Sequence, residues 1–122
     1  MSYFVDTNIL IDFLKGNDKV INRLGFEHIY ISDIVVMELY QGAKNKSDLA
    51  FIKKNLNDIK IVDTSEDIVF LAKNLVEKYT LSHNLKIFDA IIAATVIIYD
   101  LPLVTLNKKD FRYIQELELY EI

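Results

Sequence analysis

Four acidic side chains stand out by their positions in or near apolar segments. Asp6 directly follows a short apolar run, and Asp110 lies in the polar loop after the apolar pair 103–104. Glu38 and Asp89 interrupt segments that are apolar nearly all round. Burying an ionised carboxylate without a partner costs several kcal/mol, so unpaired acids in such settings call for an explanation. If the four carboxylates converge, they repel one another and raise each other's pKa unless a cation sits among them.

The residue types limit which cation and which chemistry such a cluster supports. The chain has no cysteine and only two histidines, which leaves oxygen atoms as the available ligands. Hard oxygen donors favour Mg²⁺ or Mn²⁺ over softer metals. A divalent ion held by a few carboxylates can activate water and stabilise a phosphate under attack. The pattern therefore indicates phosphodiester hydrolysis, provided that the fold brings the acids together.

Each acid also has an ordinary structural interpretation. Asp6 suits a helix N-cap, and Asp89 in a first turn gains from the helix dipole. Glu38 has Lys44 and Lys46 nearby in sequence as possible ion-pair partners. The residues after the apolar pair 103–104 are also typical of a simple turn: Thr105, Asn107 and Asp110. Residue by residue, these alternatives stay open.

The elements that must position these residues alternate between short apolar strands and helices. This order predicts an α/β fold, a three-layer α/β/α sandwich with a mainly parallel central sheet. In such folds, ligands bind at the carboxyl ends of the strands. Strands are predicted at 3–5, 29–31, 59–62, 103–104 and, as a last edge, 119–122, with helices at 7–14, 18–24, 33–43, 47–56, 65–81 and 87–99.

Length and composition predict a single domain over residues 1–122. The chain is 52% hydrophobic, with three glycines and one proline, which excludes a disordered or repeat architecture. The first residues lack the basic start of a signal peptide, and the longest apolar stretch, 90–99, is too short to span a membrane. We therefore expect a cytoplasmic protein. A net charge of −4 means that any nucleic acid must be held by a local basic patch or through metal ions.

Four segments together resemble the PIN-domain ribonucleases, in particular the VapC toxins of bacterial and archaeal toxin–antitoxin pairs. One such motif is weak, but here the four occur in order, at the family's usual spacing and over nearly the whole chain. The segments are Val5-Asp6-Thr7-Asn8-Ile9-Leu10-Ile11, residues 31–43 with Met37-Glu38-Leu39-Tyr40-Gln41-Gly42-Ala43, Phe88-Asp89-Ala90-Ile91-Ile92-Ala93-Ala94-Thr95, and residues 103–111 with Thr105-Leu106-Asn107-Lys108-Lys109-Asp110.

The resemblance implies a role for each matching residue. The acidic cluster that holds Mg²⁺ or Mn²⁺ would consist of Asp6, Glu38, Asp89 and Asp110. Thr105 would help to position water or phosphate, Asn8 would orient Asp6, and Asn107 would support the loop of the fourth motif. The sequence departs from the family's pattern at Val36, where threonine is common, and at Leu106, where a basic or polar residue is common. Neither departure removes an expected ligand.

The resemblance also implies an activity and partners. The expected activity is that of a metal-dependent endoribonuclease, which hydrolyses RNA by activated water without a covalent enzyme intermediate. The expected partners are RNA, a small VapB-like antitoxin whose tail occupies the cleft, and a second copy in a homodimer. Basic candidates for RNA contact, which could equally be solvated surface residues, are Lys44, Lys46, Lys86, Lys108, Lys109 and Arg112. Tyr40, Tyr79 and Phe111 are candidates for base stacking, although core packing is the expectation for Phe111.

Two other functions compete with a toxin nuclease. A housekeeping PIN nuclease in RNA processing would share the fold, but such enzymes usually carry added domains. A phosphoacceptor receiver module has similar length and could use Asp63, Thr105 and Lys108. That module needs paired acids after its first strand, yet Asp6 has no acidic neighbour, and it gives Glu38 no role.

Overall fold

The computed structural model describes residues 1–122 as four parallel strands with helices on both faces. The strands pair in the order β3-β2-β1-β4, which confirms the predicted α/β class with a parallel central sheet. Each strand is short and apolar, as expected for strands covered on both sides. Their bounds are β1 (Tyr3–Val5), β2 (Ile29–Ser32), β3 (Lys60–Val62) and β4 (Leu103–Val104).

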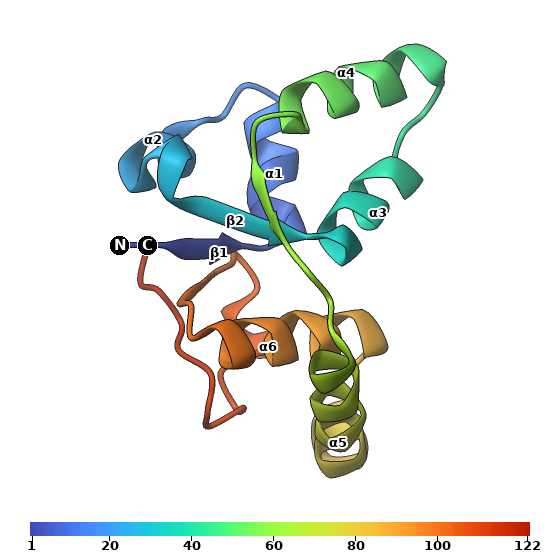
Figure 1. Cartoon of the computed structure of the whole chain (residues 1–122), viewed down its shortest axis with the longest axis vertical. Helices are drawn as coiled ribbons and strands as arrows, with labels where there is room; N and C mark the ends of the chain where they lie inside the picture. The colour runs from blue at the N-terminus through green and yellow to red at the C-terminus, as the bar shows by residue number, and fades with distance from the viewer.

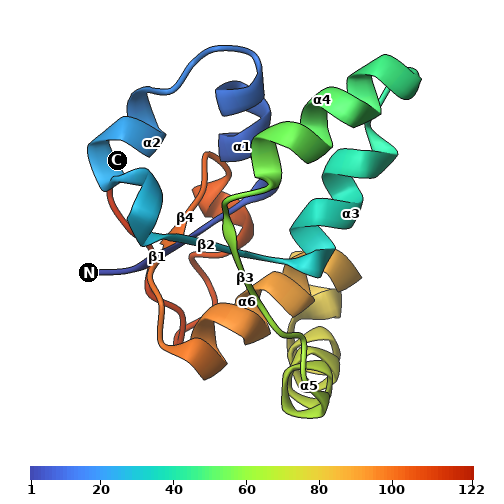
Figure 2. The ribbon, with the colours of Figure 1, turned by 45° about the horizontal axis from the view of Figure 1, so that its top comes forward.

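The helices form two layers on opposite faces of the sheet. Figure 1 shows the first four helices above the strands and the last two below them, and the rotated view in Figure 2 keeps the same division. This arrangement is the predicted three-layer sandwich. The helices are α1 (Thr7–Leu14), α2 (Lys19–Leu24), α3 (Asp33–Gln41), α4 (Lys46–Leu56), α5 (Glu66–His83) and α6 (Ile87–Tyr99), with 3₁₀ turns η1 (Phe26–His28) and η2 (Lys108–Asp110).

The register of the two central strands sets the position of the residues that follow them. Val5 of β1 pairs with Val104 of β4, so Asp6 and Thr105 leave the sheet side by side. The backbone N–H of Asp6 continues this pairing and donates to the carbonyl of Val104 at 2.9 Å. The carboxyl ends of β1 and β4 therefore form a single edge that carries polar side chains.

Helix α6 is the most apolar helix, and it lies between the sheet and α5 (Figure 1). Six of its residues are fully or almost fully buried, namely Ala90, Ile92, Ala93, Ala94, Thr95 and Val96. Their mostly small side chains let the helix approach the sheet closely, and Asp89 in its first turn is carried to the same edge. No helix in the structure combines the length and apolarity needed to cross a membrane.

Helix ends follow local rules at some positions and not at others. Asn45 and Ser65 cap α4 and α5 through their side chains, and Asn84 ends α5 in the left-handed conformation that asparagine tolerates. Ser32, by contrast, occupies the N-cap position of α3 but makes no capping bond through its side chain. Asp33 is not the cap either, because it is the first residue of the helix. The Ser32 hydroxyl is buried without a partner because Ser32 is the last residue of β2 and its side chain packs inside the domain.

The predicted edge strand over residues 119–122 is wrong in its extent. Only Leu119 forms a β-bridge, to Leu103, while the rest of the segment is irregular. Two backbone bonds flank the bridge, from Leu103 N–H to the Glu118 carbonyl and from Tyr120 N–H to the Leu103 carbonyl, each at 2.9 Å. β4 is itself only two residues long, so it offers too little edge for a longer partner.

Phe111 anchors the turn that carries Asp110 and gives a test of the fold. Its ring is 1% exposed, as predicted for a core residue. Replacing it by alanine removes a fully buried aromatic ring, so Phe111→Ala should lower the free energy of unfolding by about 3–5 kcal/mol in urea melts. The control Phe70→Ala changes a ring that is 60% exposed and should have little effect. Equal losses for both variants would contradict this packing.

Candidate active site

Asp6 is a helix cap and a buried site residue at once. It is 6% exposed, in extended conformation, and its Oδ1 accepts from the Thr7 backbone N–H at 2.8 Å. Its Oδ2 accepts from the Thr105 hydroxyl at 2.8 Å and from the Asn8 amide at 3.2 Å. Burial raises the pKa of Asp6, and these three hydrogen bonds oppose that rise. The capping and site interpretations of Asp6 are therefore compatible.

Asn8 and Thr105 join the ends of β1 and β4 around the Asp6 carboxylate. The Asn8 amide also donates to the Thr105 hydroxyl at 3.2 Å, and its carbonyl oxygen accepts from Leu106 N–H at 3.1 Å. Thr105 is fully buried and accepts from the backbone N–H of Asn107 at 3.1 Å. The geometry suits Asn8 to orient Asp6. Asn107 contributes to the loop through its backbone, and Thr105 directs its hydroxyl at Asp6.

Glu38 reaches the same site from α3 and is held by a residue that the sequence analysis overlooks. Its Oε1 accepts from the Thr7 hydroxyl at 2.8 Å, across 31 positions of sequence. Burial raises the pKa of Glu38, the Thr7 bond opposes this, and the charge of Asp6 adds to the rise. The adjacency of Thr7 to Asp6 is the only sequence signal for its role, and the signal does not reveal the contact with α3.

Asp89 and Asp110 complete the cluster from α6 and η2. Burial raises the pKa of Asp89 to about 6, and the charges of Asp6, Asp110 and Glu38 each contribute to that rise. The side chains of Asp89 and Asp110 also line one pocket of about 270 Å³. The structure thus brings the four predicted acids, which come from four separate elements, within electrostatic range of one another.

No cation of the chain neutralises this cluster. The ion pairs of the structure involve Glu27 and Glu121, not any of the four acids. Glu38 in particular pairs with neither Lys44 nor Lys46, which was the structural alternative for that residue. No three acidic or histidine side chains are arranged as a ready-made metal cage. The cluster is therefore a set of neighbouring carboxylates without a cationic partner rather than a closed coordination shell.

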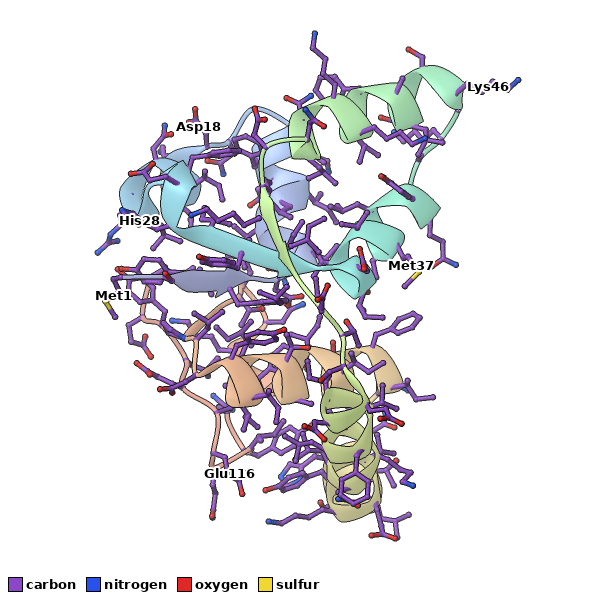
Figure 3. The ribbon with its side chains drawn as sticks, in the orientation of Figure 1. Met1, Asp18, His28, Met37, Lys46 and Glu116 are labelled. Atoms are coloured by element: carbon purple, nitrogen blue, oxygen red, sulfur yellow. The ribbon has the colours of Figure 1, made fainter.

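The predicted basic residues lie in different places. Lys86 and Lys109 line the pocket of Asp89 and Asp110, and Lys44 lines a second pocket, of about 370 Å³, together with Glu38. Lys46, at the start of α4, points away from the body of the molecule (Figure 3). Lys108 is engaged with Glu121 at 2.8 Å. Arg112 is exposed beyond η2 and lines neither pocket.

The three aromatic residues considered for base stacking do not line the pocket of Asp89, whereas two other rings do. Phe111 belongs to the core, Tyr79 is buried, and Tyr40 is exposed on α3 with Lys53 above its ring. His83 and Tyr113, which the sequence analysis does not single out, line the pocket beside Asp89. Burial raises the pKa of Tyr113, and the charges of Asp89 and Asp110 add to the rise. No sequence signal brings these two residues together, since 30 positions and a helix separate them.

The largest hollow of the surface is not the candidate site. It measures about 630 Å³, lies over the first turns of α5 between Thr64 and Lys73, and contains none of the acids described above. Hydrogen-bonded, buried and charge-coupled carboxylates mark functional sites better than volume does. The edge formed by β1, β4, α3 and α6 is therefore the candidate active site.

Comparisons with known sequences identify the family of the chain. A family model of the PIN domain matches residues 3–117. A protein named Ribonuclease VapC from Rickettsia bellii is 33% identical, and the match covers 100% of this chain and 97% of the relative. Ribonuclease VapC19 from Mycobacterium tuberculosis is 30% identical over 93% of this chain and 95% of its own length.

Solved structures give the same result at the level of the fold. A toxin–antitoxin complex from Klebsiella pneumoniae contains a chain with a TM-score of 0.80 and 34% identity, covering 99% of this chain and 100% of its own. VapBC2 from Rickettsia felis, bound to a promoter DNA fragment, has a TM-score of 0.81 at 29% identity, with 98% of both chains covered. The chain therefore belongs to the PIN domain family and, within it, to the group of proteins named ribonuclease VapC.

Proposed function

We propose that this chain is the ribonuclease toxin of a toxin–antitoxin pair and that it hydrolyses RNA with the help of Mg²⁺ or Mn²⁺. The observation that carries the proposal is the uncompensated acidic cluster, in which the pKa of Asp89 is raised to about 6, first by burial and then by Asp6, Asp110 and Glu38. Folding brings these charges together at an energetic cost, and a bound cation removes that cost. The relatives named ribonuclease supply the reaction class.

The donor atoms fit a magnesium-type ion in kind and in charge. They are carboxylate oxygens with a threonine hydroxyl and an asparagine amide behind them, and the chain has no cysteine sulfur to favour a softer metal. Mg²⁺ usually keeps several waters and binds one or two carboxylates directly. A closed cage of three acids is therefore not required, which is compatible with the open arrangement of the four carboxylates. Asp6 and Asp89 are the proposed direct ligands, with Glu38 and Asp110 beside them.

The remaining residues prepare the site and hold the substrate. When bound, the divalent ion would supply an activated water and stabilise the charge that develops on the phosphate. Thr105 and Asn8 fix one oxygen of Asp6, and Thr7 fixes one oxygen of Glu38, so both acids are held in place before substrate arrives. Lys86 and Lys109 place positive charge next to the acidic cluster, where flanking phosphates would lie.

The apolar pocket of about 370 Å³ next to Glu38 is the proposed seat of the antitoxin. It lies between α1, α3 and α4, and Ile11 and Phe51 are 40% and 49% exposed there. Exposed apolar side chains around a pocket are typical of a protein-binding surface. A segment seated in this pocket would reach Glu38 and cover the acidic cluster, which explains how one partner would block activity. The toxin–antitoxin complex from Klebsiella pneumoniae and VapBC2 from Rickettsia felis, which contain similar chains, support this partner class.

Removal of single carboxylates tests the nuclease proposal. We incubate the purified protein with a mixed pool of structured cellular RNA in Mg²⁺ or Mn²⁺, with EDTA as the metal-free control. Residues that support metal ligands from behind typically change activity by about 10- to 100-fold, and this is the loss of cleavage activity expected for Thr105→Val. Asp6→Asn and Asp89→Asn should each lower cleavage activity by more than about 100-fold. Circular dichroism checks that each variant is folded. Asp58→Asn, at an exposed position before β3, should keep full activity.

Cleavage that survives EDTA, or full activity of Asp89→Asn, would contradict this account of the site. Mapping the ends of the products identifies the cleaved RNA, and discrete ends that appear only with metal are the expected result. Loss of activity in Asp58→Asn would show that the assay responds to surface charge in general.

The raised pKa of Asp89 predicts how the stability of the metal-free protein depends on pH. Its pKa is raised from 3.8 to about 6, so the folded state binds the proton more tightly than the unfolded state. Stability therefore falls as pH rises through this window, and the whole penalty is present at pH 7.5. Asp89→Asn removes it and should stabilise the metal-free protein by about 1 kcal/mol at pH 7.5, allowing for solvent screening at this half-buried group.

Thermal melts in EDTA measure this difference, which should shrink as the pH falls through about 6 and disappear below about pH 3, where the wild-type carboxyl is protonated in both states. Addition of Mg²⁺ should raise the Tm of the wild type more than that of the variant, because binding to the folded state alone stabilises it. A variant less stable than the wild type at pH 7.5 would show that Asp89 is not under charge strain.

A charge placed in the apolar pocket tests the partner assignment. Phe51→Glu should weaken binding of the small VapB-like antitoxin by about 30-fold or more, the effect expected at a central apolar anchor. Calorimetric titration gives the Kd, and metal-dependent RNA cleavage by Phe51→Glu alone should be unchanged. Phe70→Glu, at an exposed ring of α5, is the matched control. Equal weakening in both variants would place the antitoxin elsewhere.

A further inference from the structure

A small pocket next to the acidic cluster has a composition that the proposed hydrolysis does not require. It measures about 270 Å³ and is formed by the end of α5, the first turn of α6, and η2 with the residues after it. Asp89 and Asp110 are among its lining residues. The rest of its lining combines aromatic rings with lysine side chains, so this pocket differs from both the acidic cluster and the apolar pocket beside Glu38.

The aromatic part is a preformed stack. The rings of His83 and Tyr113 lie 4.0 Å apart between centroids with only 9° between their planes. The buried ring of Tyr79 packs edge-on against both, at 5.9 Å and 5.1 Å. The Ser82 hydroxyl lies 2.8 Å from His83 Nδ1 and fixes the imidazole further. Tyr113 stacks on one face of the imidazole, and His83 as a whole is exposed, so part of its surface remains accessible to a planar ligand.

The lysine part carries free positive charge. Lys86 and Lys109 line the same pocket as Asp89 and Asp110, yet neither forms an ion pair with them or with any other acid. Lys108, one residue away, is instead engaged with Glu121 at 2.8 Å. Both free lysines are exposed. Their ammonium groups are therefore available to an anionic group that enters the pocket.

An aromatic face and two free ammonium groups in one small pocket suit a nucleotide. Stacking on an aromatic ring accepts any base, because every base has a π-face, and lysines hold the phosphate. We propose that this pocket binds one unpaired nucleotide of the RNA next to the cleaved bond, with its base on His83 and its phosphate on Lys86 and Lys109. The proposal rests on the nuclease function above and names its substrate class, namely RNA that is single-stranded at this nucleotide.

A purely structural role for the stack predicts a different behaviour. His83 and Tyr113 also tie the end of α5 to the segment that follows Asp110. If that were their only function, a change at His83 would act through Asp110 and reduce kcat. A stacking subsite predicts instead a rise in KM, and a direct optical signal from the stacked base.

The test uses the whole protein and a short single-stranded RNA with 2-aminopurine at one position after another. In EDTA, binding of the wild type should quench the fluorescence at one position. His83→Ala should abolish this quenching and weaken binding by about 5- to 50-fold. His83→Phe keeps a flat ring and should restore both. His28→Ala changes the second histidine, at the end of η1 on a different part of the molecule (Figure 3), and should change neither.

The salt dependence of binding separates the lysines from the ring. Each phosphate contact to a single strand contributes about 0.7 to the slope of log K against log salt concentration. Lys86→Ala and Lys109→Ala should each reduce that slope by about this amount, whereas His83→Ala should leave it unchanged. Lys54→Ala, at an exposed position of α4, is the matched control and should keep the wild-type slope.

Cleavage of the same RNA in Mg²⁺ distinguishes this inference from the proposed function. If the wild type cleaves and His83→Ala has unchanged KM and quenching, the subsite is wrong while the nuclease stands. If His83→Ala lowers kcat alone, the stack only positions Asp110, and the subsite is again wrong. If the wild type binds with the expected quenching but never cleaves, the nuclease proposal fails and the nucleotide subsite stands.

Discussion

The buried carboxylate of Asp6 is the point at which the fold and the site depend on each other. It ends β1, caps α1 through the Thr7 N–H, and accepts from Thr105 just after β4. Loss of any of these donors would leave the buried carboxylate with too few hydrogen bonds. The free-energy cost of such an unsatisfied buried group exceeds the net stabilisation that one hydrogen bond provides. The junction of β1 with β4 is therefore specified by polar contacts, although both strands are only two or three residues long.

Around this fixed carboxylate, the chain gathers like charges instead of neutralising them. The other three acids come from different elements: Glu38 from α3, Asp89 from α6 and Asp110 from η2. Packed helices, and not loops alone, therefore hold the like charges close together. The apolar faces of α3 and α6 supply the burial that opposes it. The same burial lowers the local dielectric and enlarges the repulsion. The apolar packing of the scaffold and the raised pKa values of the acids are therefore two effects of one packing arrangement.

The order of elements, the parallel sheet and the acid positions could be predicted from sequence because each depends on local patterns. The apolar runs give the strands, and acids at their ends or inside apolar helices are conspicuous. Two contacts could not be predicted from sequence, namely those between Thr7 and Glu38 and between His83 and Tyr113. Each joins residues that only the complete fold brings together. At Ser32 a local pattern predicts a contact that does not form. Serine is a suitable residue type for a helix cap, but Ser32 is the last residue of β2, and its hydroxyl is buried without making the capping bond.

The short connection between α5 and α6 ties substrate contacts to the acidic cluster. Asn84 ends α5 in a left-handed conformation, and α6 begins at Ile87, so His83 and Asp89 are only six positions apart on two successive helices. Lys86 lies between them, directly before α6. A change in this turn would move the stacking ring and the lysine relative to Asp89 while the β1–β4 junction stayed intact. The choice of RNA can therefore vary through this turn, whereas the acidic cluster depends on the sheet.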